Sequence, residues 1–196
     1  QKVVGVSCTA ALTTNRKRRG SNQAYIGFYG DKFLKVFHLQ ITKGEFDRSQ
    51  EEAIVSEVLI DKIANVLIGR AETHSRSSFL KLSQAKNSFY ESYEQALLAG
   101  HINSVQVDAE GTKTADREFS GSILSGSFNP SHKGHMELAA VGRDILQCDT
   151  AFEISVANVD KPNLPEKVIL ERAKQFMGNS ILLMTVAPLF SDKAIL

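Results

Sequence analysis

The sequence predicts an α/β protein in which the last part of the chain forms a parallel sheet. From residue 119 onward, short apolar segments alternate with segments of helical periodicity. The segment 180–186 is apolar almost throughout, which is typical of a strand buried on both faces. The segment 1–69 instead places short strands before one long amphipathic helix. Together these patterns favour a parallel sheet covered by helices on both faces, preceded by a smaller α/β segment.

Short strands open the chain. Two are expected over 2–6 and 25–29, which are rich in Val, Ile and aromatic residues. The dipeptide Gly30-Asp31 is a turn signal, so a third strand over 33–41 is expected to complete a hairpin.

A helix follows these strands. Ser49 can cap it, and Glu52, three residues later, completes the pattern of a capping box. Gly69 is placed to end it. Between these residues an apolar stripe recurs at helical spacing and comprises Ile54, Val58, Ile63 and Leu67.

The segment 70–118 is expected to connect two separate cores. It is richer in Ser and in charge, and it contains one possible helix that carries Phe89 and Tyr93 and ends at Gly100. Short strands are expected over 102–107 and 113–117. The segment holds too many aromatic residues for a disordered linker, so we expect modest structure of its own.

The segment 119–196 carries the alternation that predicts the parallel sheet. Strands are expected over 122–125, 151–157 and 180–186. The first helix is expected over 135–146. The second begins at Pro165, which suits the first helical position, and ends at Gly178.

Composition narrows the possible partners and compartment. The formal net charge is +1, which gives no indication of a broad nucleic-acid surface. The dense basic run over 16–19 is expected to be a solvated loop, with a phosphate contact as the alternative. Cys8 and Cys148 are isolated and predict no disulfide framework, so a reducing, cytoplasmic location is expected. We expect no signal peptide and no membrane span. The missing initiator Met indicates a fragment.

The segment 126–135, which reads GSFNPSHKGH, lies between a predicted strand and a predicted helix. A helix N-terminus offers unpaired N–H groups and partial positive charge, as a phosphate site requires. Gly126 permits a tight bend, and Gly134 leaves space for a phosphate. His132 and His135 are three residues apart and are expected on one side of the helix start.

These residues resemble the nucleotidylyltransferase (cytidylyltransferase-like) superfamily, because every fixed position of its Gly-x-Phe-x-Pro-x-His-x-Gly-His pattern is present. The resemblance implies a Rossmann-like fold and nucleotidyl transfer without a covalent intermediate. It implies that His132 and His135 hold the triphosphate and stabilise charge at the α-phosphate, with Mg²⁺ accompanying the substrate. The implied phosphate-binding residues are Gly126, Ser127, Phe128, Asn129 and Gly134. A pair of surface histidines is the alternative; zinc is disfavoured without a nearby Cys or carboxylate.

Three further residues are candidates. Lys161 and Thr185 follow or end strands at the edge where parallel strands bind ligands, and Arg172 is on the helix expected after the strand over 151–157. By the same resemblance Lys161 would contact a substrate phosphate, with an exposed loop lysine as the alternative. Arg172, in the pair Glu171-Arg172, would contact substrate, with a structural surface ion pair as the alternative. Thr185 ends the third strand. The superfamily's second nucleotide-binding signature does not follow, so the sequence predicts an incomplete catalytic domain.

The first segment carries a second resemblance. Residues 4–14, Arg18-Arg19-Gly20 and the strand 24–29 resemble the later half of a CinA C-terminal domain, the nicotinamide-nucleotide amidase family. The family's Gly-rich loop is replaced by 13–20, and its upstream serine-containing site is absent. Cys8 stands near a family active-site loop, but a buried cysteine at a strand end is the preferred interpretation.

The expected function is transfer of a nucleotidyl group from a nucleoside triphosphate to a phosphorylated small-molecule acceptor, with release of pyrophosphate. The two resemblances together imply nicotinamide nucleotide metabolism as its context. A non-catalytic nucleotide-binding scaffold is one alternative. The other is an amidase acting through the first segment. The base, the acceptor and the oligomeric state are not determined by the sequence.

Overall fold

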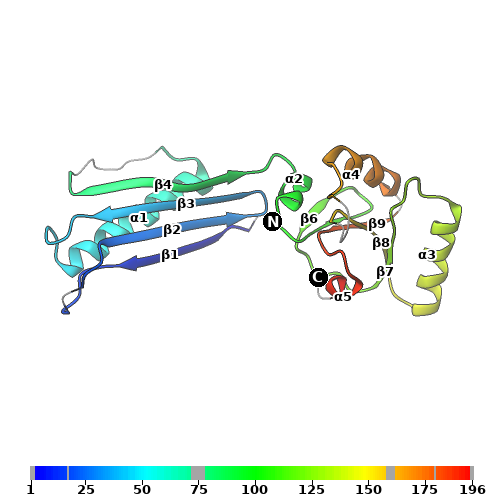
Figure 1. Ribbon diagram of the computed structural model, residues 1–196, viewed down its shortest axis with the longest axis horizontal. Coiled ribbons are helices and arrows are strands. Elements are labelled where there is room, and N and C mark those ends of the chain that lie inside the picture. Colours follow the sequence, from blue (N-terminus) through cyan, green and yellow to red (C-terminus); the bar gives the residue numbers. More distant parts are fainter. Residues whose placement is uncertain (1–2, 17, 72–77, 158–161, 179, 195–196) are drawn as a thin grey trace. The chain divides into compact units, whose positions relative to one another are not determined.

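A computed structural model describes residues 3–16, 18–71, 78–157, 162–178 and 180–194 (Figure 1). It divides the chain into two compact units, Gln1–Phe89 and Tyr90–Leu196. Each unit has its own hydrophobic core. The prediction of separate cores for the two ends of the chain is therefore confirmed, and the protein is of mixed α/β class.

The first unit is an antiparallel sheet with one helix packed on it. Its strands are β1 (Gly5–Ala11), β2 (Asn22–Gly30), β3 (Phe33–Ile41) and β4 (Leu80–Phe89), in that order across the sheet. Side chains alternate between faces along a strand, so one face presents apolar residues to α1 (Arg48–Ile68). The buried core of this unit includes Ala24, Ile26, Phe28, Phe37, Leu39, Ile41, Val55 and Val58.

The helix α1 begins earlier than the sequence predicted. Asp47, in an extended conformation, is the capping residue: its carboxylate accepts the Gln50 N–H at 2.8 Å, and Gln50 Oε1 accepts the Asp47 N–H at 2.9 Å. The predicted capping box of Ser49 and Glu52 is wrong, because Glu52 is paired with Arg48 at 2.6 Å instead. Gly69 ends the helix in the left-handed region, with φ 68°, as predicted.

The segment 70–118 is not a separate connector. Its strand β4 pairs with β3 along its whole length, so it belongs to the first unit. Phe89 is the last residue of that strand and not part of a helix. β4 is a mostly exposed edge strand without an apolar alternation, so no local pattern predicted it. The rest of the segment belongs to the second unit.

The second unit is built on a five-stranded mixed sheet in the order β6-β5-β9-β8-β7. The strands β7 (Ser122–Ser125), β8 (Thr150–Ser155) and β9 (Ile181–Thr185) are parallel, as predicted. β5 (Ser104–Val107) runs antiparallel to β9, and β6 (Lys113–Ala115) runs antiparallel to β5. The parallel arrangement therefore holds for three strands and not for the whole sheet.

The helices of the second unit bury one face of this sheet. They are α2 (Tyr93–Leu98), α3 (Lys133–Leu146) and α4 (Glu166–Ala173), the last continued by a 3-10 turn over Lys174–Phe176. Their shared core includes Leu97, Val105, Phe128, Ala139, Phe152, Ile154, Ile169, Phe176 and Met184. Alternation sends the intervening strand residues to the opposite face, where a pocket lies near the short helix α5 (Phe190–Lys193). The sequence predicted helices on both faces of the sheet. This arrangement is not seen in the described residues.

Candidate functional site

The loop that carries the two histidines leaves the carboxyl end of β7 and enters α3. Because β7, β8 and β9 are parallel, their carboxyl ends lie along one edge of the sheet, which is where open α/β sheets bind ligands. The Gly126 N–H donates to the Glu153 carbonyl at 3.0 Å and so ties the start of the loop to β8. The loop is thus anchored at the edge that the sequence predicted.

Phe128 fixes the middle of this loop. Its side chain is 1% exposed and makes edge-on contacts with the rings of Phe152 at 5.5 Å and Phe176 at 5.0 Å between centroids. Its backbone is in the left-handed region, with φ 42°, which is uncommon for a residue with a large side chain. The Phe128 side chain is therefore a core anchor, and only its backbone is left for phosphate contacts.

Both loop glycines make room for neighbouring rings. A Cβ atom at Gly126 would lie 2.7 Å from Cζ of Phe128, so glycine is required there by the ring and not by a left-handed backbone. A Cβ atom at Gly134 would lie 3.3 Å from Cε1 of His132. The space that we expected Gly134 to leave for a phosphate is thus bounded by an imidazole.

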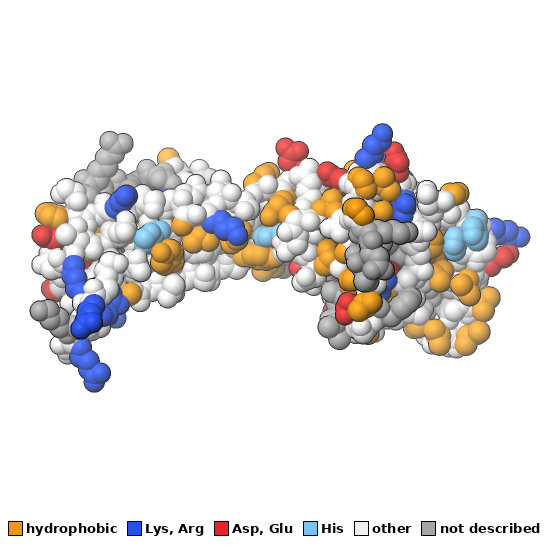
Figure 2. Space-filling model, viewed as in Figure 1, with side chains coloured by type: hydrophobic (Ala, Val, Ile, Leu, Met, Phe, Trp, Pro, Cys, Tyr) orange, Lys and Arg blue, Asp and Glu red, His pale blue; other side chains and the backbone are white. Residues whose placement is uncertain are grey.

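The two histidines form a stacked pair at the start of α3. Their ring centroids are 3.7 Å apart with 24° between the ring planes, so the prediction that they share one side of the helix start is confirmed. His132 is the exposed N-cap residue, with φ −142° and ψ 172°, and His135 is half-buried. Figure 2 shows histidine side chains at the surface where α3 begins, beside basic and acidic side chains.

A hydrogen bond fixes the tautomer of His135. The backbone N–H of His132 donates to Nδ1 of His135 at 3.1 Å. Because a backbone N–H can only donate, Nδ1 is the acceptor, and the neutral ring carries its proton on Nε2. The Phe128 ring meets the His135 ring edge-on at 5.0 Å and restrains it further. His135 is thus oriented with one N–H donor, Nε2, left for a ligand.

Gln175 is a site residue that the sequence reasoning missed. Its Oε1 accepts from the Ser131 N–H at 2.7 Å and from the Ser131 hydroxyl at 2.9 Å, while its Nε2 donates to the Phe128 carbonyl at 3.0 Å. The contact joins residues that are 44 positions apart, so no local pattern indicates it. Gln175 therefore connects the histidine loop to the turn that follows α4.

Arg172 lies in the last turn of α4, three residues before Gln175 in the 3-10 turn that follows. Its Nε is buried and makes no hydrogen bond within the described part of the chain. Glu171 lies 4.0 Å from the Lys167 ammonium, so its carboxylate has a partner other than its neighbour in sequence. Lys161 lies outside the described residues. Residues three apart share a helix face, which places Arg172 on the face that carries Gln175.

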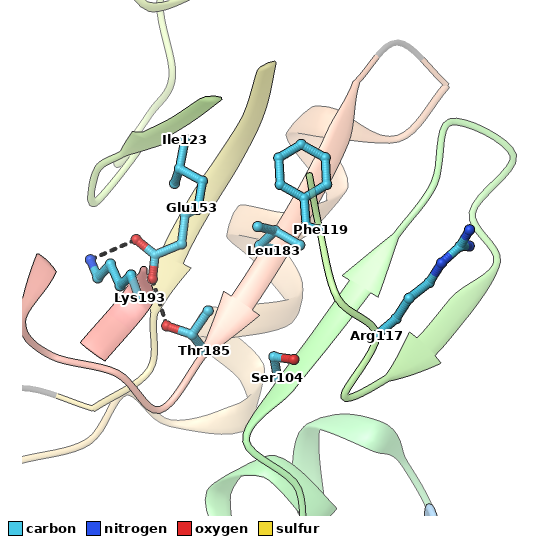
Figure 3. A pocket seen from close by; sticks show the side chains of 8 residues that line it. All are labelled: Ser104, Arg117, Phe119, Ile123, Glu153, Leu183, Thr185 and Lys193. Carbon is cyan, nitrogen blue, oxygen red and sulfur yellow. Dashed lines mark hydrogen bonds and ion pairs between the residues drawn. The ribbon is translucent and has the colours of Figure 1, made fainter. Parts of the chain in front are cut away.

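Thr185 lies in a different environment. Its hydroxyl donates to Oε1 of Glu153 at 2.6 Å, and Lys193 Nζ lies 2.8 Å from Oε2 of the same carboxylate. Lys193 also contacts the Ser125 hydroxyl at 3.3 Å. Figure 3 shows the side chains of Glu153, Thr185 and Lys193 turned toward one another in a pocket on the sheet face opposite the helices. Arg117 extends away from them. The structure does not bring Thr185 together with the histidine pair.

Glu153, Thr185 and Lys193 form a buried cluster with a structural role. Glu153 is 1% exposed, and its two oxygens are taken by Thr185 and Lys193. Isolated charges are strongly disfavoured in the interior, so the pair is stable only because both partners are present. Sequence reasoning missed Glu153 and Lys193, since a single acidic residue in a short strand gives no indication of its partner.

Cys8 is not the buried residue at a strand end that we expected. It lies in the middle of β1, and it is exposed because β1 is an edge strand of its sheet. Partial burial nevertheless raises the pKa of the Cys8 thiol. The thiolate is the reactive form of cysteine, so this shift makes Cys8 less nucleophilic near neutral pH.

Within the basic run, Arg18 is bound more closely than expected for a residue of a solvated loop. The guanidinium of Arg18 donates to the carbonyls of Ala11 at 3.0 Å and Ser21 at 2.6 Å, so this residue closes the loop between β1 and β2. Its neighbours Arg16 and Arg19 are exposed.

The described residues present no group of three or more His, Cys, Asp or Glu side chains that could hold a metal ion. No helix among them is long and apolar enough to cross a membrane. Comparison of the chain with family models, curated proteins and solved structures found no match.

Proposed function

We propose that the second unit is a nucleotidyltransferase with a Rossmann-like core, acting on a nucleoside triphosphate and a phosphorylated small-molecule acceptor. The observation that supports this best is the stacked pair of His132 and His135 at the start of α3, directly after a parallel strand. The helix start supplies N–H groups and partial positive charge for phosphates. His135 adds an oriented donor, because its Nδ1 is already occupied.

The proposed reaction is a single displacement at the α-phosphorus. A phosphate oxygen of the acceptor forms a bond to this phosphorus, and the bond from the phosphorus to the oxygen that bridges to the β-phosphate breaks. Pyrophosphate leaves with that electron pair. Negative charge builds on the α-phosphate oxygens in the transition state, where the Nε2–H of His135 would donate a hydrogen bond.

Five residues of the loop have a proposed part in holding the triphosphate. The backbone N–H groups of Ser127, Phe128 and Asn129 would face phosphate oxygens, while Phe128 keeps its ring in the core. Gly126 and Gly134 allow the rings of Phe128 and His132 to occupy their positions. Positioning of this kind is the main contribution that a protein makes to phosphoryl chemistry.

Two cations complete the proposed site. Arg172 has a buried Nε without a hydrogen bond in the described structure, and a substrate phosphate would supply the missing acceptor. Lys161, which follows β8 in the sequence, is proposed to contact phosphate. Mg²⁺ would enter with the triphosphate as part of the substrate. Both sequence resemblances favour a nicotinamide nucleotide, or a related nucleotide, as the acceptor.

The test is pyrophosphate release from a panel of nucleoside triphosphates and phosphorylated acceptors, nicotinamide mononucleotide among them. The double variant His132→Ala/His135→Ala serves as the blank that exposes a contaminating activity. Release that depends on one acceptor and is lost in the blank supports the proposal. Binding of a triphosphate without release with any acceptor would identify a scaffold instead. Release of ammonia from nicotinamide mononucleotide would identify an amidase.

A further inference from the structure

We infer that Gln175 is a positioning residue that holds the histidine loop in its active geometry. The consequence for catalysis rests on the proposed function, but the consequence for the histidine pair does not. Gln175 lies in the 3-10 turn after α4, and it contacts the loop at both Phe128 and Ser131.

The amide of Gln175 uses its hydrogen-bonding capacity fully. Oε1 accepts two bonds from Ser131, and Nε2 donates one bond to the Phe128 carbonyl and another to the Arg172 carbonyl at 3.2 Å. An amide has two acceptor sites and two donor protons, so all four are engaged. The side chain must both accept and donate. A carboxylate could not donate to Phe128, and an ammonium could not accept from Ser131.

These bonds act on both ends of the segment 128–131 of the loop. Phe128 has a φ of 42°, a conformation that persists only where the surroundings impose it. Ser131 directly precedes His132, the N-cap residue of α3. Gln175 therefore fixes the loop immediately before the first histidine.

The same turn also controls the second histidine. Phe176, the neighbour of Gln175, packs against the Phe128 ring at 5.0 Å, and that ring contacts His135 at 5.0 Å. Backbone and ring of Phe128 are thus held by adjacent residues of one turn. Loss of the Gln175 amide would free the backbone of the loop while the ring stays packed.

The test is Gln175→Met, which keeps the side-chain length and removes all four hydrogen bonds. The stacked rings of His132 and His135 should give a nuclear Overhauser contact in the wild type that the variant loses. Misplacement of a catalytic group by about 1 Å typically costs on the order of a hundredfold in rate, so kcat for pyrophosphate release should fall by about that factor. The KM for the triphosphate should rise as well, because the freed backbone carries N–H groups that are proposed to hold phosphate oxygens.

The matched control is Gln147→Met at the other end of α3, where Nε2 donates to the Asp144 carbonyl of the same helix and not to the histidine loop. It should leave both readouts unchanged. If Gln175→Met does not fold, Gln175→Glu decides the question: it keeps the acceptor for Ser131 but cannot donate to Phe128, and should lose part of the ring contact and of kcat.

Retention of the ring contact in the folded Gln175 variants would overturn the inference, as would its absence from the wild type. A wild type that turns over no triphosphate would overturn the proposed function alone, because the ring contact still decides the role of Gln175.

Discussion

Two polar clusters in the second unit are organised in opposite ways. In the histidine loop, hydrogen bonds within the protein orient the side chains but leave Nε2 of His135 as a donor. In the pocket cluster, Thr185 and Lys193 take up both oxygens of Glu153. A cluster that satisfies its own groups stabilises the fold, whereas one that orients a group and leaves it open is able to bind. The following variants test whether this distinction holds.

The largest expected effect on stability comes from Lys193→Met. It would leave the Glu153 carboxylate buried without its cation, and breaking a buried ion pair typically costs about 3–5 kcal/mol. Denaturant unfolding of the second unit measures the change. The control is Glu153→Met/Lys193→Met, which removes both charges and should recover most of the stability. Equal losses in the single and double variants would contradict a structural ion pair.

His135→Ala should have a comparably large effect on catalysis and little on folding. Loss of one donor to the transition-state charge costs about 3–4 kcal/mol of barrier, or roughly a hundred- to a thousandfold in kcat. His38→Ala, in the first unit, is the matched control and should keep full turnover. Thermal melts accompany the rate measurements. An active His135→Ala enzyme would exclude the proposed role, and a variant that unfolds would indicate a structural histidine.

Thr185→Val tests whether this residue serves substrate or structure. The variant removes a hydroxyl that donates to a buried carboxylate, and a hydrogen bond to a charged group contributes about 1.5–3 kcal/mol. We expect that loss in unfolding free energy, with KM and kcat for pyrophosphate release unchanged. A large rise in KM with unchanged stability would instead assign Thr185 to the substrate.

A smaller effect is expected from Gly126→Ala, which tests how the loop is built. The added Cβ would lie 2.7 Å from the Phe128 ring, and overpacking of this kind costs about 1–3 kcal/mol. Because that ring also contacts His135, kcat should fall together with stability. Gly142→Ala, where the nearest atom would be 3.8 Å away, is the control. Unchanged stability in Gly126→Ala would show that the ring can move aside.

Local patterns were sufficient for the part of the site that is contiguous in sequence. The strand before Gly126, the helix after it and the shared side of the two histidines followed from spacing alone. Gln175 and the pair of Glu153 and Lys193 could not be predicted, because their partners come from other elements of the fold. These contacts form only when segments that are far apart in the sequence come together in the folded unit.

The same limit applies to the first unit. The end of α1 at Gly69 was predictable, because glycine has a strong preference for the left-handed position there. The start was not, since Asp47 with Gln50 and Ser49 with Glu52 are both plausible capping pairs. In the structure Asp47 and Gln50 form the capping box, and Glu52 pairs with Arg48. β4 lacked the alternation by which an edge strand would be recognised.

The strand order of the second sheet has a practical consequence for dissecting this protein. β9 lies between β8 and β5, so a fragment beginning at residue 119 would lack the strand that covers one side of β9. An uncovered strand edge is a template for pairing with other chains, and such a fragment should precipitate. Fragments that end at Phe89 and begin at Tyr90 would each keep a whole sheet. The two units should therefore be expressed separately with this boundary.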